Sequence, residues 1–280
     1  MKILATGTTG SIGSSLVPYF EKKGHEVIRL RSDIRDEHSV EEEIANFRNA
    51  ELVLHMAAVV TSVPAELAGR NTLDVNVTGS FNVATAALRN NLRFCYFSTT
   101  VKYSTGLSVI REDSKTDSPT LYGNSKHLGE LAVKHVYRNA SDELLVVRPC
   151  FTYGSSKDYS VVTNLIRSHF TKEPVVVRLN KLFKKDYTHI DDFSEAIDLL
   201  ISQYAFGDYN ITAGDPMSFG TILEMLESKS IKPFMYLNQE NDYLGDHIVS
   251  PEKLVKTTGW QPKISLSKGM DMIINKFKNE

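Results

Sequence analysis

The stretch KILATGTTGSIG, residues 2–13, decides the fold of the first half of the chain. It opens as an apolar run typical of a buried strand and then carries three glycines at three-residue spacing, immediately before a helical pattern. Such glycines allow a tight turn, close approach of the backbone to a pyrophosphate, and packing of the helix on the strand, while the helix amino terminus binds the phosphates. We therefore predict a dinucleotide-binding turn. Its predicted contacts are Gly7, Gly10, Ser11, Ile12 and Gly13.

Short apolar runs alternate with helical patterns through the first 150 residues. The runs typical of strands are 2–6, 26–30, 51–57, 93–98 and 143–148. The helical patterns between them cover 11–23, 38–48, 73–90 and 122–139. This alternation predicts an α/β fold with a doubly wound parallel sheet and right-handed crossovers.

The regular alternation loosens after Arg148, and a second unit is expected there. We predict that residues 1–150, with 186–212 returning to them, form a dinucleotide-binding domain. Residues 151–185 and 213–280 would form a small mixed lobe over the carboxyl ends of the strands, where open sheets bind ligands. The lobe is therefore the expected substrate-binding part.

The composition is that of a globular protein whose partners are small molecules. The 280 residues are 41% hydrophobic, the formal net charge is -2, and Lys and Arg form no dense run, so neither a nucleic-acid nor a membrane surface is indicated. Cys95 and Cys150 lie in apolar runs, where cysteine acts as a small hydrophobe, and the eight histidines show no metal-ligand spacing. With no signal peptide or long apolar segment in this sequence, we expect a cytoplasmic protein without a metal ion.

The end of the second predicted strand, RLRSD (residues 29–33), bears on which dinucleotide binds. A carboxylate at this place would hold a ribose 2'-hydroxyl, whereas an arginine accommodates a 2'-phosphate. Arg31 and Ser32 occupy the expected position and favour NADP. NAD stays open as the alternative, because Asp33 follows directly and a shift of two residues reverses the assignment.

The motif YGNSK, residues 122–126, puts a tyrosine and a lysine on one face of a predicted helix. A free phenol has a pKa of about 10 and carries protons poorly at neutral pH. A positive charge about 4 Å away is worth on the order of 4 kcal/mol at an effective dielectric of about 20, which corresponds to about three pKa units. We therefore predict that Lys126 lowers the pKa of Tyr122 toward neutrality, where acid-base catalysis is most effective.

These motifs occur in an order that resembles a known family, the extended short-chain dehydrogenase/reductases, and in particular its NAD-dependent epimerase/dehydratase group. Besides the glycine turn and YGNSK, the matching segments are DI (33–34), HMAA (55–58), VNVTGSFNV (75–83), RPCFTYG (148–154) and DYTHIDDF (186–193). The resemblance covers nearly the whole chain and implies a Rossmann fold that binds a nicotinamide dinucleotide. To the cofactor site it adds Asp33, Ile34, Ala57, Ala58 and Asn76.

The resemblance also implies the roles of the catalytic residues. Tyr122 would be the proton donor or acceptor, and Lys126 would bind the nicotinamide ribose as well as tune the phenol. The family's serine or threonine lies four residues before a tyrosine, which here selects Thr99, ahead of Tyr103, to hydrogen-bond the reacting oxygen. Thr100 is the alternative if the alignment slips by one residue.

Departures from the family pattern narrow the expected reaction. Dehydratases of the family carry Asp and Glu directly after this threonine, whereas this chain has Thr100 and Val101. We therefore expect an NADP-dependent reductase of a 4-keto nucleotide sugar. The alternatives are an NAD-dependent 4-epimerase of a nucleotide sugar, and a protein that binds the dinucleotide without catalysis.

The expected substrate contacts also depart from the family. Phe151 stands where relatives often have asparagine, and Lys185 stands where many have an arginine that faces the nucleotide diphosphate. His247 is the nearest candidate for a further arginine that is missing, and Thr100 completes the predicted substrate site. Relatives often pair through the two helices that match 73–90 and 122–139 here, so a homodimer is expected.

Overall fold

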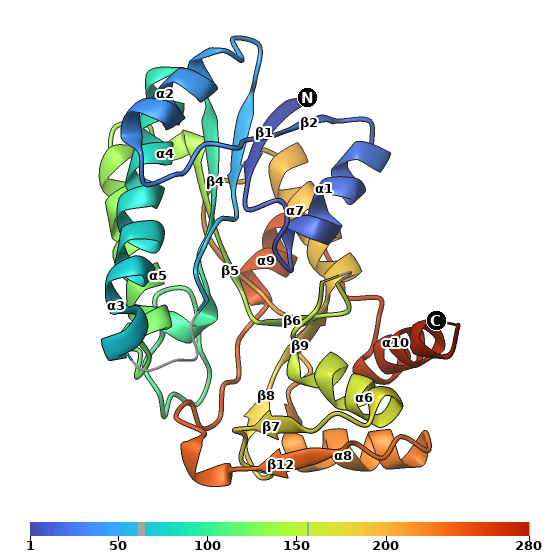
Figure 1. Cartoon of the computed structure of the whole chain (residues 1–280). Coiled ribbons are helices and arrows are strands. Elements are labelled where there is room, and N and C mark those ends of the chain that lie inside the picture. The colour runs from blue at the N-terminus through green and yellow to red at the C-terminus, as the bar shows by residue number, and fades with distance from the viewer. Residues whose placement is uncertain (61–64, 156, 280) are drawn as a thin grey trace.

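The computed structural model describes residues 1–60, 65–155 and 157–279, and Figure 1 shows a layered α/β unit with a smaller lobe. Within these residues the main sheet has six parallel strands in the order β10-β5-β4-β3-β1-β2. The strands are β1 (Lys2–Thr6), β2 (Glu26–Arg29), β3 (Leu52–His55), β4 (Arg93–Phe97), β5 (Leu144–Pro149) and β10 (Gly207–Ile211). The predicted doubly wound parallel sheet is confirmed.

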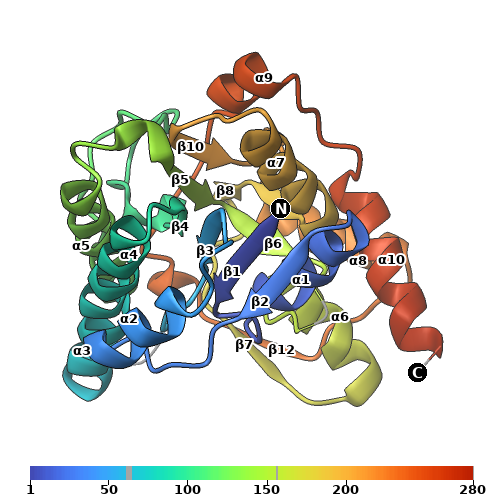
Figure 2. The same cartoon turned by 90° about the horizontal axis from the view of Figure 1, so that it is seen from above.

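Helices cover both faces of this sheet (Figures 1 and 2). One face carries α2 (Glu37–Ala45), α3 (Ala65–Leu73), the π-helical turn η1 (Asp74–Gly79), α4 (Ser80–Arg89) and α5 (Leu121–Val136). The other face carries α1 (Gly13–Lys22), α7 (Ile190–Ser202) and α9 (Glu252–Thr258). Short 3-10 turns are η2 (Thr100–Lys102), η3 (Ser141–Glu143) and η4 (Gln239–Asn241).

The interior strand β1 shows why the sheet needs continuous apolar runs. Ile3 and Ala5 pack into the core on the side of α1 and α7, while Leu4 packs into the core on the side of α2, α4 and α5. Alternate side chains of a strand point to opposite faces, so a strand that is covered on both faces is apolar at every position.

The strand order changes direction next to β1. The chain leaves β1 for β2 on one side and then crosses to β3 on the other side. In open α/β sheets, ligands bind in the crevice outside the carboxyl ends of the strands at such a switch point. The glycine turn that follows β1 lies at this point.

The smaller lobe lies below the sheet in Figure 1 and has a hydrophobic core of its own. Its helices are α6 (Val161–Thr171), α8 (Phe219–Ser228) and α10 (Leu266–Asn279). Its strands are paired as β6 (Phe151–Tyr153) with β9 (Tyr187–His189), β7 (Val175–Val177) with β12 (Met235–Leu237), and β8 (Lys184–Lys185) with β11 (Met217–Ser218). Leu254 and Trp260 pack instead beside α7, where the indole Nε1 donates to the carbonyl of Asp192 at 3.1 Å.

Both cysteines are buried free thiols, as expected for side chains that act as small hydrophobes. None of the helices in the described ranges is both long and apolar enough to cross a lipid bilayer. In the part of the chain that the structure describes, no group of three or more His, Cys, Asp or Glu side chains is placed to hold a metal ion.

Candidate active site

Three adjoining cavities lie along the crevice at the glycine turn. The sheet-edge cavity, of about 430 Å³, lies between this turn and the segment after β2. The central cavity, of about 420 Å³, has Gly7, Gly10 and Ala58 in common with it. The lobe cavity, of about 380 Å³, meets the central cavity at Phe151 and Thr152. The three form one path from the end of β2 to the lobe.

The glycine turn has the geometry of a phosphate-binding turn. Gly7 has a φ of 66°, and a Cβ there would lie 2.6 Å from Cα of Ala57. A Cβ on Gly13 would lie 2.8 Å from Cα of Thr8. Helix α1 begins at Gly13, its N-cap Ile12 makes no side-chain capping bond, and its first turn contains no acidic residue. The positive end of α1 is therefore open to an anion, as dinucleotide binding requires.

Tyr122 and Thr99 line the central cavity together. Tyr122 lies in the first turn of α5, which Thr120 caps by accepting a hydrogen bond from the Gly123 amide at 3.0 Å. Thr99 follows β4, and its hydroxyl accepts a hydrogen bond from the Val101 amide at 3.2 Å. Burial raises the pKa of Tyr122 to about 12, and the nearby side chain of Thr99 offsets part of that rise. At neutral pH the phenol is therefore protonated and able to donate.

Lys126 also lines the central cavity, one helical turn after Tyr122. Its side chain is buried, with Nζ 4.3 Å from the centroid of the Tyr96 ring. Among the described residues no group hydrogen-bonds to this nitrogen. Burial lowers the pKa of Lys126 to about 7, and the charge of Glu130 opposes that change. A buried amino group without a partner is rare, and this one fits a site that receives the hydroxyl groups of a bound dinucleotide.

The predicted effect of Lys126 on the pKa of Tyr122 is wrong for this structure. The pKa of the phenol rises instead of falling, because burial acts more strongly on it than any neighbouring group. The same burial lowers the pKa of Lys126 to about 7 and so favours its uncharged form. Lysine is therefore a hydrogen-bond donor to the cavity here and not a strong local charge.

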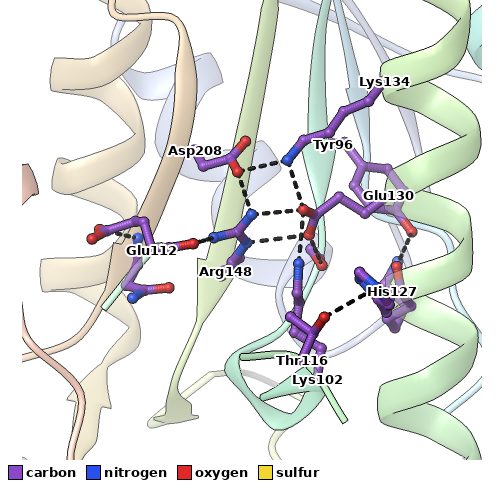
Figure 3. A network of polar contacts seen from close by, with 12 residues as sticks. Tyr96, Lys102, Glu112, Thr116, His127, Glu130, Lys134, Arg148 and Asp208 are labelled. Carbon is purple, nitrogen blue, oxygen red and sulfur yellow. Dashed lines mark hydrogen bonds and ion pairs between the residues drawn. The ribbon is translucent and has the colours of Figure 1, made fainter. Parts of the chain in front are cut away.

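A buried ion network holds α5 against β4 and β5 behind these residues (Figure 3). Its centre is the carboxylate of Glu130, which is 1% exposed. Oε1 accepts hydrogen bonds from Lys102, Lys134 and Arg148 at 2.8, 2.9 and 2.6 Å. Oε2 accepts one from the hydroxyl of Ser98 at 2.8 Å. The network fixes the separation of the two elements that carry the hydroxyl groups of the central cavity.

Arg148, the arginine of RPCFTYG, extends this network to the edge strand β10 (Figure 3). Its guanidinium donates to Asp208, which also accepts from Lys134 at 2.6 Å. It donates further to the hydroxyl of Tyr103 at 2.7 Å and to the carbonyl of Glu112 at 2.9 Å. Arg148 is therefore an anchor between strands and does not reach the cavities.

Asn76, a predicted cofactor contact, lies outside all three cavities. Its buried side chain accepts from the Val59 amide at 2.8 Å and donates to the Val59 carbonyl at 3.0 Å. It also donates to Oγ of Ser125 at 2.9 Å. Ser125 precedes Lys126 on α5, so Asn76 positions this helix from the π-helical turn η1.

The sheet-edge cavity includes seven of the residues selected for the cofactor site, namely Gly7, Gly10, Ser32, Asp33, Ile34, Ala57 and Ala58. Arg31 is exposed and is not one of its lining residues, while the amides of Arg31 and Ser32 donate to the carboxylate of Glu43 at 2.9 Å each. Arg35 lines the cavity instead. Its Nε and Nη2 donate to Asp33 at 2.9 and 2.6 Å, and these bonds lower the pKa of Asp33 to about 2.

The predicted substrate residues separate into two groups. Phe151 and Lys185 line the lobe cavity. Thr100 and His247 are buried outside all three cavities, where His247 Nε2 and Thr100 Oγ1 share a hydrogen bond of 3.0 Å. Thr100 also donates to the carbonyl of Pro149 at 3.3 Å. Because they bond to each other and line none of the three cavities, the prediction that these two residues contact the ligand is corrected.

Two arginines that line the cavities were not predicted from the sequence. Arg35 lines the sheet-edge cavity, and its signal was its spacing of two residues from Asp33, which lets the two side chains pair. Arg178 lines the lobe cavity, and its signal was its position directly after the apolar run VVV. A charged side chain that ends a buried strand at the ligand-binding side is a candidate for a ligand contact.

The sequence matches known proteins over most of its length. The sequence model of the NAD dependent epimerase/dehydratase family matches residues 3–212. UDP-glucuronic acid decarboxylase 1 from Arabidopsis thaliana is 26% identical over 310 residues, which span 100% of this chain and 70% of that protein. A dTDP-4-dehydrorhamnose reductase from Streptomyces griseus is 30% identical over 178 residues, which span 62% of this chain and 57% of that protein.

A solved structure has the same fold. The crystal structure of UDP-glucose 4-epimerase from Thermus thermophilus, in complex with NAD, has a TM-score of 0.87 to this chain at 23% sequence identity. The match covers 99% of both chains, so the likeness extends to the lobe. At this identity it shows the fold alone.

The variant Lys126→Met should remove a pH dependence from the stability of the cofactor-free protein. Burial lowers the pKa of Lys126 to about 7 from an ordinary value of 10.5. Between these pH values the unfolded chain binds a proton that the folded chain does not, so native stability rises with pH through this window. The lysine is therefore most destabilising below about pH 7. Methionine keeps an apolar stem, and the variant should exceed the parent in stability there.

Urea unfolding between about pH 6 and pH 10 measures this difference, because the midpoint and slope give the free energy of unfolding at each pH. The advantage of Lys126→Met should shrink as the pH rises. Lys22→Met, at an exposed position of α1, is the matched control and should show no such trend. A difference between Lys126→Met and the parent that stays constant with pH would contradict the prediction.

Proposed function

The chain belongs to the NAD-dependent epimerase/dehydratase family, and we propose that it is an NADP-dependent oxidoreductase that reduces a 4-keto nucleotide sugar. The observation that carries the proposal is that Tyr122, Thr99 and Lys126 line one cavity with the glycine turn. This combination offers a proton donor, a group that orients it, and a place for a dinucleotide.

In the proposed reaction Tyr122 gives its proton to the keto oxygen of the sugar. Thr99, which lines the same cavity as Tyr122, would hydrogen-bond the reacting oxygen. Because burial raises the pKa of Tyr122 to about 12, the phenol is protonated at neutral pH and begins as a donor.

The cofactor site fits a nicotinamide dinucleotide along the sheet-edge and central cavities. The glycine turn and the open end of α1 would hold the pyrophosphate. Lys126, whose Nζ has no hydrogen-bond partner within the described residues, would donate to the ribose hydroxyls. The nicotinamide, when bound, supplies the hydride.

The proposed preference for NADP now rests on Arg35 in place of Arg31. Arg35 lines the sheet-edge cavity, and a guanidinium suits a phosphate because it presents parallel N–H donors. Asp33, which pairs with Arg35, is the group that would hold the 2'-hydroxyl of NAD. The balance between these two side chains therefore sets the preference.

We propose that residues 151–185 and 213–280 form the substrate-binding lobe. Its separate hydrophobic core and its cavity, which meets the central cavity at Phe151, support this division. Trp260 and helix α9 are the part of this range that packs on the sheet. The names of two relatives contain UDP- and dTDP-sugars, which supports a nucleotide sugar as the substrate.

We also propose a homodimer formed through α4 and α5. Phe81 on α4 is 40% exposed, and Leu128 and Leu131 on α5 are 47% and 49% exposed. The two helices pack against each other on the same face of the sheet (Figure 1). Exposed apolar side chains that gather in this way are typical of interfaces.

If the homodimer forms through α4 and α5, a charge introduced on α5 should lower the molar mass of the protein in solution. Light scattering at micromolar concentration should give a dimer for the parent and a monomer for Leu128→Lys/Leu131→Lys, because a buried charge weakens an apolar interface. Leu182→Lys, which alters a leucine that is 81% exposed in the lobe, is the control and should remain dimeric. A monomeric parent at this concentration excludes the proposal.

The variant Tyr122→Phe should lose most of the catalytic rate and keep its cofactor. Removal of a general acid lowers kcat by about 10²- to 10⁴-fold, whereas the phenyl ring keeps the packing around the hydroxyl. The assay follows NADPH oxidation with 4-keto sugars linked to UDP, dTDP or GDP, and fluorescence titration gives the affinity for NADPH.

Tyr204→Phe removes a hydroxyl from an exposed tyrosine away from the three cavities and should match the parent. Unchanged turnover in Tyr122→Phe would exclude Tyr122 as the proton donor. Interconversion of UDP-sugar epimers without consumption of NADPH would identify the 4-epimerase instead. Binding of NADPH without turnover of any of these sugars would favour a dinucleotide-binding protein.

A pair of arginine variants tests the cofactor preference. Arg35→Gln should weaken NADP+ binding by roughly 10-fold or more, because it removes charge-assisted hydrogen bonds to the 2'-phosphate. Its NAD+ affinity should be kept or increased, since Asp33 is released from its partner. Calorimetric titration of both dinucleotides measures the effect.

Arg31→Gln is the matched control and should bind NADP+ as the parent does. If Arg31→Gln loses NADP+ affinity and Arg35→Gln does not, Arg31 is the residue that binds the 2'-phosphate, as its position after β2 predicted. If the parent binds NAD+ more tightly than NADP+, the proposed preference for NADP is wrong.

A further inference from the structure

The lobe cavity is mostly apolar and has few ways to hold an anion. Its walls come from β6, β7 and β9 and from the first turn of α6. In the described part of the chain, two lining side chains are cationic, Lys185 and Arg178. A substrate that carries phosphates inside this cavity therefore depends on one of them.

Lys185 cannot turn to a ligand, because its three N–H groups are already used. Nζ donates to the two carboxylate oxygens of Asp242 at 2.9 and 3.0 Å and to the carbonyl of Gly245 at 2.8 Å. The Lys185 and Asp242 side chains are 3% and 2% exposed. Asp242 also accepts from the amide of Asn180 at 3.0 Å. Movement of the ammonium toward a phosphate would leave a buried carboxylate unpaired, which is strongly unfavourable.

The amino terminus of α6 borders the same cavity, but a carboxylate of the protein already occupies it. Asp158 is buried and accepts from the amides of Gly154 and Ser160 at 2.5 and 2.7 Å. It also accepts from the hydroxyl of Thr163 in the first turn of α6. A second anion at this end of the helix would meet the charge of Asp158.

Arg178 is the cation that remains. It follows β7 directly, is exposed, and lines the cavity. No ion pair or hydrogen bond engages its guanidinium among residues 1–60, 65–155 and 157–279. A guanidinium binds phosphate through two parallel N–H groups, and an exposed arginine can form such bonds without breaking an internal pair.

We propose that Arg178, and not Lys185, is the side chain that binds the diphosphate of a nucleoside diphosphate in the lobe cavity. The inference rests on the proposed function, since it takes the substrate to be a nucleotide sugar. It assigns Lys185 to the stability of the lobe through its pair with Asp242. The residue that selects phosphorylated ligands is then Arg178, directly after β7, and not the residue at position 185, where many relatives have an arginine.

Titration calorimetry of the protein with NADP+ bound tests this assignment. The probes are UDP, dTDP, uridine and inorganic pyrophosphate. Arg178→Gln should weaken UDP and dTDP binding by about 10- to 100-fold, the usual effect of losing charge-assisted hydrogen bonds. Uridine has no phosphate, so its affinity should not change. Arg178→Lys should recover part of the loss, because it restores the charge without the parallel donors.

Two variants serve as matched controls. Arg48→Gln makes the same change at an exposed arginine outside the three cavities and should bind UDP as the parent does. Lys185→Met/Asp242→Asn removes both charges of the buried pair together and should keep the UDP affinity. Circular dichroism and NADP+ binding report whether each variant is folded, and the Arg178 variants decide the question even if the double variant is not.

Each outcome separates this inference from the proposed function. If Arg178→Gln binds UDP and dTDP like the parent, Arg178 is not the anchor, while the nucleotide-sugar substrate stands. A loss of affinity in a folded double variant together with a normal Arg178→Gln would return the role to Lys185. If the parent binds NADP+ but neither UDP nor dTDP, both the inference and the proposed substrate are wrong. Pyrophosphate that binds as tightly as UDP would indicate a site for free anions and would also overturn the inference.

Discussion

The carboxylate of Glu130 lies buried between α5, the helix that carries Tyr122, and the end of β4, which Ser98 and Thr99 follow (Figure 3). Three cations surround it, so its charge is neutralised where water cannot reach. The hydroxyl of Ser98 donates to the same carboxylate, which ties the end of β4 to α5. The alignment of the phenol with Thr99 therefore depends on this one buried acid, although Glu130 itself touches no cavity.

Local patterns predicted the parts of the site that the backbone imposes. Gly7 and Gly13 are required because a Cβ at either position would collide with the neighbouring backbone. Tyr122 and Lys126 share a helix face because they are four residues apart. The apolar runs indicated the strands because a parallel sheet is covered on both faces. In each case the physical cause lies within a few residues of sequence.

Contacts between distant segments were not predictable from residue type. Lys185 has the charge that its position suggested, but that charge is paired with the carboxylate of Asp242, 57 residues later in the chain. Thr100 and His247 are 147 residues apart, and their hydrogen bond removes both from ligand binding. The pKa of Tyr122 similarly depends on how much protein surrounds the phenol, which the spacing of YGNSK does not contain. Only the folded chain combines these segments.

The internal ion pairs of the lobe affect how a ligand is received. Asp158 accepts hydrogen bonds at the amino terminus of α6, and Asp242 pairs with Lys185. These groups therefore have their hydrogen-bond partners before any ligand binds. Asp158 and Lys185 are thus preorganised, so the side chain of the lobe that a ligand has to order is the exposed Arg178. Among the described residues, the first turn of α1 contains no acidic side chain and its N-cap makes no side-chain bond, so a bound anion would supply hydrogen bonds that this end of the helix lacks. Occupancy should consequently slow amide hydrogen exchange at the start of α1 much more than at the start of α6.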